Sequence, residues 1–154
     1  MPLIGRVNLN KAIKNKVGGL NEKLTAIYVK TLSNIVSATP VHFKDGGRLK
    51  NNWFLTVAQP SGKTRGGSAN GSSSLAELGK MPDYVLDKKI YFTNNLPYAN
   101  TVEYGGYPLI KDQSNGTWTG SRYQHLSSRG YSRQAPNGMV RVNIKKMEAR
   151  IKKL

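Results

Sequence analysis

The residue best placed to do chemistry is Glu103, the single carboxylate in the stretch NNLPYANTVEYGGYP (residues 94–108). A catalytic carboxylate needs a partner acid, a nucleophile or a metal group, and none accompanies it in this stretch. Pro97 is a favourable first helical residue and Gly105 a favourable stop, so residues 97–104 are predicted to form a short helix. Glu103 then lies in the last turn, where the helix dipole disfavours a carboxylate and a cation elsewhere is expected to compensate it.

Three interpretations of Glu103 follow, namely a structural or intersubunit ion pair, a solvated side chain, and a catalytic base. The ion pair is favoured, because a base would lack every partner that its chemistry requires. Arg48, in the stretch GGRLKNNW, is the expected cation. The sequence therefore predicts that Glu103 is an anchor and that the protein is not an enzyme.

The other short motifs do not define a reactive site. SGKT (residues 61–64) resembles the end of a phosphate-binding loop, but that pattern needs a glycine where this chain has Val57. Asp83 and Asp87 are four residues apart, and a solvated pair is expected there rather than a metal site or an acid–base dyad. We therefore predict no catalytic residue and no nucleotide site.

Composition excludes several classes of protein. The chain of 154 residues has no cysteine, and its two histidines, His42 and His125, lie too far apart for a local ligand pair. No metal and no cofactor are therefore expected. No apolar run approaches the roughly 20 residues that span a bilayer, and the amino terminus is too polar for a signal peptide, so the expected origin is the cytosol, without membrane contact. The length fits one domain, residues 1–154.

The charge is strongly basic, with 24 Lys and Arg residues against 8 Asp and Glu, a formal net charge of +16. Such a field favours a polyanionic or acidic partner, although a generally basic solvated surface is the alternative. The residues expected to contact DNA or an acidic neighbour are Lys63, Arg65, Arg122, Arg129, Arg133, Lys145 and Lys146.

Hydrophobic periodicity predicts the first elements. Residues 20–39 have the spacing of an amphipathic helix, and Pro40 follows. A shorter stretch before them has the same period but is cut by Gly18-Gly19, which allows either a separate helix or a kinked start of the long one. Residues 53–59 and 88–94 alternate as strands do.

The rest of the chain is predicted as two polar segments and a helix. Residues 60–74 are rich in Gly and Ser and are expected to form a flexible loop. Residues 108–134 are expected to form an extended arm or a long hairpin, because a structureless loop of that length is unusual. A basic helix closes the chain, with Asn137 as its expected cap. The predicted fold is α+β, a small, mostly antiparallel sheet packed by a long amino-terminal helix, a short middle helix and a carboxyl-terminal helix.

Three stretches occur in a distinctive order: TPVHFKDGGRLKNNW (residues 39–53), TNNLPYANTVEYGGYP (93–108) and RQAPNGMVRV (133–142). Together they resemble the HK97-type tail-component family, the tail-completion or neck proteins of long-tailed bacteriophages. Here HFKDG intervenes where the family passes almost directly from Thr-Pro-Val to the glycine. The matching positions are Thr39, Pro40, Val41, Gly47, Leu49, Lys50, Trp53, Pro97, Tyr98, Ala99, Glu103, Tyr104, Gly105, Ala135, Pro136, Gly138, Met139 and Val140.

The resemblance implies a structural virion protein. It implies a ring, with six subunits as the expected number, at the head–tail junction (neck), which completes the tail and joins it to the head connector. The implied neighbours are copies of the chain itself, the head connector and the tail-terminator or tail-tube protein, with DNA passing through the lumen. The structural or interface residues expected in such a subunit are Arg48, Trp53, Tyr98, Glu103, Tyr104 and Gly105.

A second class of function stays open on the residues alone. The charge of +16 and the basic carboxyl-terminal helix are also typical of a free-standing nucleic-acid-binding protein. Such a protein should bind DNA with a steep dependence on salt.

Overall fold

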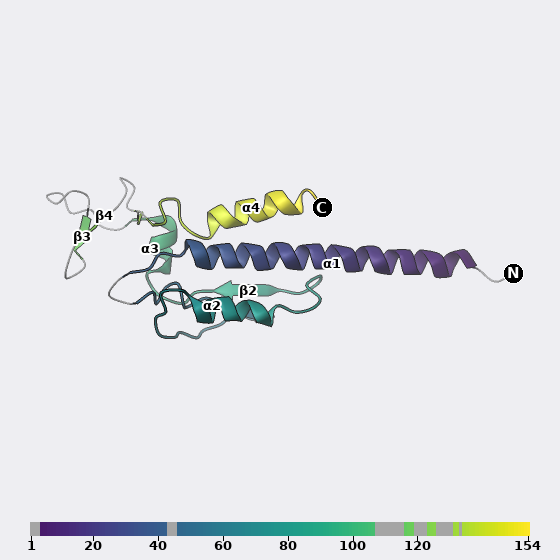
Figure 1. Cartoon of the computed structure of the whole chain (residues 1–154), viewed down its shortest axis with the longest axis horizontal. Coiled ribbons are helices and arrows are strands. Elements are labelled where there is room, and N and C mark those ends of the chain that lie inside the picture. Colours follow the sequence, from purple (N-terminus) through teal and green to yellow (C-terminus); the bar gives the residue numbers. More distant parts are fainter. Residues whose placement is uncertain (1–3, 43–45, 107–115, 119–122, 126–130, 133) are drawn as a thin grey trace.

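The computed structural model describes residues 4–42, 46–106, 116–118, 123–125, 131–132 and 134–154 (Figure 1). Helices pack with a small two-stranded antiparallel sheet, so the predicted α+β class is confirmed. One long helix runs along the molecule, with the carboxyl-terminal helix on one side of it and the sheet on the other (Figure 1). This arrangement brings residues from three distant stretches of the chain to one end of the long helix.

Helix α1 (Ile4–Ala38) has 35 residues, which corresponds to a length of roughly 50 Å. It begins well before residue 20 and continues through Gly18-Gly19, so the shorter stretch is the start of the long helix and not a separate helix. The ribbon of α1 runs straight, without the kink that this alternative expected (Figure 1). Two glycines cost roughly 1 kcal/mol each in a helix interior, which weakens the helix without blocking it, because no proline interrupts the turn. After Ala38, Thr39 donates its hydroxyl hydrogen to the carbonyl of Ile35 (2.7 Å) and Pro40 follows.

The sheet consists of β1 (Phe54–Val57) and β2 (Ile90–Thr93), which pair antiparallel with Phe54 opposite Thr93 and Val57 opposite Ile90. Both strands lie inside the ranges predicted from alternation, residues 53–59 and 88–94, and are shorter. Strand β1 ends before Ala58, whose φ of 72° lies outside the strand region.

Three short helical segments and one longer helix complete the described body. Helix α2 (Ser72–Ala76) continues into a 3₁₀ turn, η1 (Glu77–Lys80). The short middle helix is α3 (Ala99–Tyr104), close to the predicted 97–104. The last helix is α4 (Arg141–Ile151), which lies against α1 (Figure 1).

Eight of the buried apolar side chains form one cluster at the carboxyl end of α1. Ile35 and Val36 come from α1, and the other members come from loops, α3 and the segment before α4. Removal of such side chains from water, at about 25 cal/mol per Å², is the main force that holds these segments together. The remaining members are Leu49, Trp53, Leu96, Val102, Ala135 and Met139.

Two short strands lie within the predicted arm 108–134. Strand β3 (Gly116–Trp118) pairs antiparallel with β4 (Tyr123–His125), as a hairpin would. Most of the arm lies outside the described residues, including Arg122, Arg129 and Arg133. The predictions for these three arginines therefore stay predictions.

Candidate functional site

Glu103 joins α3 to α4. Glu103 is only 5% exposed, and its Oε2 accepts hydrogen bonds from the backbone N–H groups of Met139 (2.7 Å) and Val140 (2.7 Å). Its Oε1 accepts the backbone N–H of Arg141 (2.9 Å). These N–H groups lie at the start of α4, where no acceptor exists within the helix itself. Glu103 therefore caps α4 from another element of the chain.

Arg141 completes the contact with Glu103. Its Nε donates to Oε1 of Glu103 (3.0 Å), and its Nη2 donates to the backbone carbonyl of Glu103 (2.7 Å) and to the hydroxyl of Tyr131 (3.1 Å). Its guanidinium carbon lies 4.7 Å from the centre of the Tyr104 ring. The arginine thus holds both the carboxylate and the carbonyl at the end of α3, where a cation also suits the dipole of that helix.

The close approach of the two segments requires a glycine at position 138. Gly138 has φ +80°, and a Cβ atom there would lie 2.5 Å from the backbone oxygen of Glu103 and 3.0 Å from its carboxylate carbon. Any side chain would therefore displace the backbone of α3 from the start of α4. This explains in physical terms why Gly138 stands in the Ala-Pro-Asn-Gly-Met-Val stretch.

The charge state of Glu103 follows from these contacts. Burial of the carboxyl raises its pKa, but hydrogen bonds from the N–H groups of Val140, Arg141 and Met139, together with the Arg141 side chain, hold its pKa below the usual value. Glu103 is therefore ionised at neutral pH, with both oxygen atoms occupied.

Two sequence predictions about this region are wrong. The cation that pairs with Glu103 is Arg141 and not Arg48, which is exposed on the turn between α1 and β1. The cap of α4 is Glu103 and not Asn137, because a carboxylate from α3 accepts the N–H groups at the start of that helix. The prediction that Glu103 belongs to a structural ion pair is confirmed.

Trp53 links the end of α1 to the sheet. Its indole Nε1 donates to the hydroxyl of Thr39 (3.0 Å), and its ring stacks on Phe92 with centres 5.0 Å apart and planes at 7°. Its backbone N–H donates to the hydroxyl of Ser74 in α2 (2.9 Å). Thr39 and Trp53 thus satisfy each other's polar groups inside the apolar cluster, where an unpaired donor would be costly.

The Gly/Ser-rich segment 60–74 is held by the chain itself, contrary to the prediction of a flexible loop. Asn52, which is fully buried, donates to the carbonyls of Arg48 (2.7 Å) and Arg65 (2.8 Å) and accepts the N–H of Arg65 (2.6 Å). Asn51 donates to the carbonyl of Gly66 and accepts the N–H of Ser73, each at 3.0 Å. Two adjacent amides therefore replace the hydrophobic anchor that the segment lacks.

Arg65 is used inside this segment. Its Nη2 donates to Glu77 (3.0 Å) and to the carbonyl of Trp53 (3.2 Å), and its guanidinium lies 3.9 Å from the centre of the Phe54 ring. One terminal nitrogen of its guanidinium is therefore engaged within the chain, and the prediction that Arg65 contacts DNA or an acidic partner stays a prediction. Burial raises the pKa of Glu77, while hydrogen bonds from Lys80 and Arg65 outweigh this and lower the pKa.

The remaining predicted residues fall into two groups, three at α3 and three lysines elsewhere. Tyr98 is half-buried at the start of α3 and packs against the core, and Gly105 ends α3 with φ 78°. Tyr104 is exposed under the guanidinium of Arg141. The other predicted cations that the structure describes are exposed, namely Lys63 in the loop and Lys145 and Lys146 on α4.

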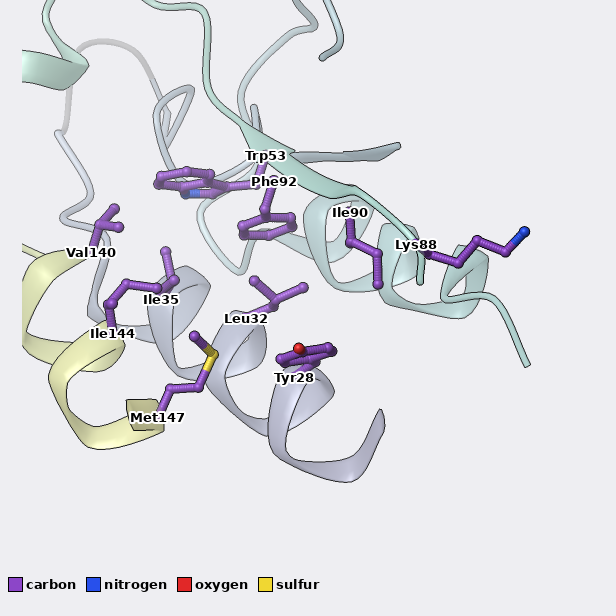
Figure 2. A pocket seen from close by; sticks show the side chains of 10 residues that line it. All are labelled: Tyr28, Leu32, Ile35, Trp53, Lys88, Ile90, Phe92, Val140, Ile144 and Met147. Carbon is purple, nitrogen blue, oxygen red and sulfur yellow. The ribbon is translucent and has the colours of Figure 1, made fainter. Parts of the chain in front are cut away.

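An apolar groove of about 360 Å³ lies between α1, β2 and α4 (Figure 2). Trp53 and Phe92 stack at one wall, and the ammonium end of Lys88 points away from the apolar side chains (Figure 2). The groove offers shape and apolar surface without a convergent polar group. Its lining residues are Tyr28, Leu32, Ile35, Trp53, Lys88, Ile90, Phe92, Val140, Ile144 and Met147.

Two features are absent from the described residues. No three histidine or carboxylate side chains there lie close enough together to hold a metal ion. None of the helices in those ranges has both the length and the apolarity that a membrane span requires.

Sequence reasoning missed Arg141, Asn51 and Asn52. One signal for the contact between Glu103 and α4 was present: the basic helix 141–151 has no acidic residue in its first turn, so its N–H groups needed an anion from elsewhere. Asn51 and Asn52 stood next to Trp53 in a predicted turn, but nothing in their spacing indicated which carbonyls they bind.

Comparison of the chain with protein-family models, curated proteins and solved structures gives no match. The functional argument therefore depends on the residues of this chain and on their geometry.

Proposed function

We propose that this chain is a structural subunit of a long-tailed bacteriophage particle, which assembles into a ring at the head–tail junction. In this role it completes the tail, joins it to the head connector and lets DNA pass through the lumen of the ring. In this role its chemistry is association with neighbouring subunits and not catalysis.

The observation that carries the proposal is the meeting point of the motifs that resemble tail-completion proteins. Thr39 and Trp53, from the first motif, bond to each other; Glu103, from the second, binds the backbone of Met139 and Val140, from the third. Short motifs that match by chance need not contact one another. In this chain the three motifs contact one another, in the apolar cluster and at the start of α4. A shared fold requires such contacts, so they support the resemblance over the chain as a whole.

The state of Glu103 supports a structural role over a catalytic one. A general base needs a free lone pair and a pKa near the working pH. Glu103 has two hydrogen bonds on each carboxylate oxygen and a lowered pKa. It is therefore a poor proton acceptor and a strong anchor.

The test is the mass of the purified protein by light scattering at physiological salt, together with its presence in purified particles. The proposal expects a ring-sized oligomer, or a subunit that enters the ring on the finished tail and is found in particles. A protein that stays monomeric and is absent from particles would overturn it.

A second candidate, a free-standing nucleic-acid-binding protein, is favoured by the surface of α4. Its outward side carries exposed cations, while the side toward α1 carries Ile144, Met147 and Ile151. A monomer that binds short duplex DNA tightly would favour this candidate. The exposed cations are Lys145, Lys146, Arg150, Lys152 and Lys153.

A further inference from the structure

The amino-terminal half of α1 projects beyond the rest of the described body (Figure 1). Large apolar side chains are exposed along it: Leu9 is 60% exposed and Ile13 52%, and Val17 and Leu20 follow. They are spaced by four, four and three residues, so they lie on one side of the helix. A row of apolar side chains that the chain itself leaves uncovered marks an interaction surface.

The row follows the pattern of a coiled-coil seam. Ile13, Val17, Leu20, Leu24 and Ile27 are spaced alternately by four and three residues, as the a and d positions of a heptad are. The stripe is narrower than the face of an ordinary surface helix, which is typical of pairing with one other helix. Leu24 and Ile27 are half-buried where α1 joins the body, so the exposed seam continues a surface that the fold already packs.

The charges beside the seam select the partner. In this heptad register Lys16 and Lys23 occupy g positions and Lys14 an e position, and all three are exposed. No acidic residue precedes Glu22, which lies at the f position, away from the seam. Two copies paired through this seam would bring these lysines close together with no acidic residue at the flanking positions to offset them. Glutamates at the flanking positions of another helix would instead form salt bridges with them.

We propose that the projecting half of α1, which we name the α1 seam (residues 9–23), pairs as a coiled coil with an acidic amphipathic helix of a neighbouring protein. The pairing buries Ile13, Val17 and Leu20 against leucine or isoleucine side chains, with Leu9 at a flanking g position, and sets the lysines against glutamates. The inference deepens the proposed function and rests on it for one point, that the neighbour is another component of the particle.

The experiment uses the full chain and a synthetic labelled peptide of three heptads, with leucine at a and d and glutamate at e and g. A matched peptide carries glutamine in place of glutamate. Fluorescence anisotropy measures binding of each. The expected result is binding of the glutamate peptide that is at least ~10-fold tighter than that of the glutamine peptide, and that weakens as salt rises.

Two variants test the seam itself. Ile13→Asn combined with Leu20→Asn is expected to weaken binding at least ~10-fold, because two apolar side chains leave the interface. The matched control combines Ala12→Asn with Ala26→Asn, which places the same residue type at exposed positions outside the seam and is expected to change binding less than ~3-fold. Circular dichroism checks that helix content is the same in both.

A charge-exchange variant separates specific helix pairing from nonspecific apolar binding. The variant with Lys14, Lys16 and Lys23 all changed to Glu is expected to lose its binding to the glutamate peptide and to bind a peptide that has lysine at its e and g positions. Because the leucines of the two peptides are identical, only complementary charge explains such an exchange.

Three outcomes would overturn the inference. The first is equal binding of the glutamate and glutamine peptides, and the second is unchanged binding in the Ile13 and Leu20 variant. The third is a wild-type protein that is oligomeric and binds no peptide, while the Ile13 and Leu20 variant is monomeric. That result would make the seam a contact between copies of the chain. Light scattering of the unliganded protein tests the proposed ring separately. A protein that binds the peptide but is monomeric and absent from particles keeps the inference and overturns the proposed ring. A ring-sized oligomer that does not bind the peptide keeps the proposed ring and overturns the inference.

Discussion

Glu103 lies at the carboxyl end of one helix and at the amino end of another, and the two positions have opposite electrostatic consequences. In the last turn of α3 its charge meets the negative end of that helix dipole. At the start of α4 it meets three backbone N–H groups and the positive end of a second dipole. Arg141 neutralises the remaining charge, so the arrangement stabilises the fold.

Glu103→Gln is expected to lower the free energy of unfolding by about 1–3 kcal/mol at pH 7, because the amide keeps the size but loses the charge that the N–H groups and Arg141 face. Thermal unfolding followed by circular dichroism measures this. Glu148→Gln, at an exposed carboxylate on α4, is the matched control and should change stability by less than ~0.5 kcal/mol.

The same variant has a consequence for pH. The pKa of Glu103 is lower in the folded chain than in the unfolded chain, so its contribution is complete above the unfolded pKa and is lost as pH falls through the folded pKa. The gap in melting temperature between wild type and Glu103→Gln should therefore be constant near neutrality and close as the solution is acidified below about pH 4.3. A gap that widens on acidification would contradict the ionised cap.

Gly138→Ala should destabilise the protein by about 1–3 kcal/mol, because its φ of +80° and the 2.5 Å approach to the Glu103 oxygen leave no room for a methyl group. Gly106→Ala is a matched control, since Gly106 has φ +90° with no atom within 4 Å of the new Cβ. The difference between the two in urea unfolding isolates the steric clash from the cost of the left-handed backbone. Equal losses would mean that the close approach at Gly138 does not matter.

Among the elements, helix α1 holds two glycines that nothing in the described structure requires. A Cβ at Gly18 or Gly19 would meet no atom within 4 Å, and neither residue has a positive φ. Gly18→Ala with Gly19→Ala should stabilise the helix by about 1 kcal/mol per site, which slows amide exchange in the projecting half about five-fold or more.

The control for this pair is Gly47→Ala, where φ is +80° and a Cβ would lie 2.7 Å from Ala69 Cα. This substitution should destabilise the turn instead of stabilising it, and hydrogen exchange reports both effects in one experiment. If amide exchange does not slow in either half of α1 after the Gly18 and Gly19 changes, this would argue that α1 bends at these residues in solution.

The segment 60–74 depends on Asn52. Asn52→Ala removes three hydrogen bonds to Arg48 and Arg65 and should lower stability by about 2–3 kcal/mol, because buried backbone groups lose their partners. Asn95→Ala, which removes two bonds to the same segment from an exposed side chain, should cost less than ~1 kcal/mol. Limited proteolysis within residues 60–70 should become faster in the first variant and stay close to wild type in the second.

For the molecule as a whole, the net charge of +16 favours binding to polyanions. Substitution of the lysines on one face at a time shows which face the polyanion contacts. If DNA lies along α4, replacing its outward lysines with glutamine should reduce the slope of log K against log salt by about 0.9 for each phosphate that the variant no longer neutralises. Titration of short duplex DNA at several salt concentrations gives the slope. The lysines to replace are Lys145, Lys146, Lys152 and Lys153.

The control replaces an equal number of exposed lysines on α1 and so removes the same net charge. It should alter the slope less than the α4 variant does, because the two faces lie on different helices. Identical slopes for both variants would mean that DNA responds to the overall field and not to α4. The control lysines are Lys11, Lys14, Lys16 and Lys23.

Elements that depend on local periodicity could be predicted from the amino-acid sequence. The alternating strands and the short helix around 97–104 lie where they were predicted, within a few residues, and the amphipathic run 20–39 is helical up to Ala38, in a helix that begins much earlier, at Ile4. Each follows from side chains three, four or two positions apart, which are neighbours in space in any chain that adopts that backbone. The anchoring role of Glu103 was also predictable, because the last turn of a helix cannot stabilise a carboxylate alone.

The groups that those residues meet depend on tertiary packing. Glu103 binds Arg141 and not Arg48, and Asn52 binds Arg65 thirteen positions away, and nothing in the composition of the two stretches indicated these pairings. A side chain bonded to a distant backbone N–H or carbonyl leaves no periodic trace in the sequence, because every residue except proline offers the same two backbone groups. Which of them lies within reach is set by how the helices and the sheet pack, and packing is a property of the whole chain.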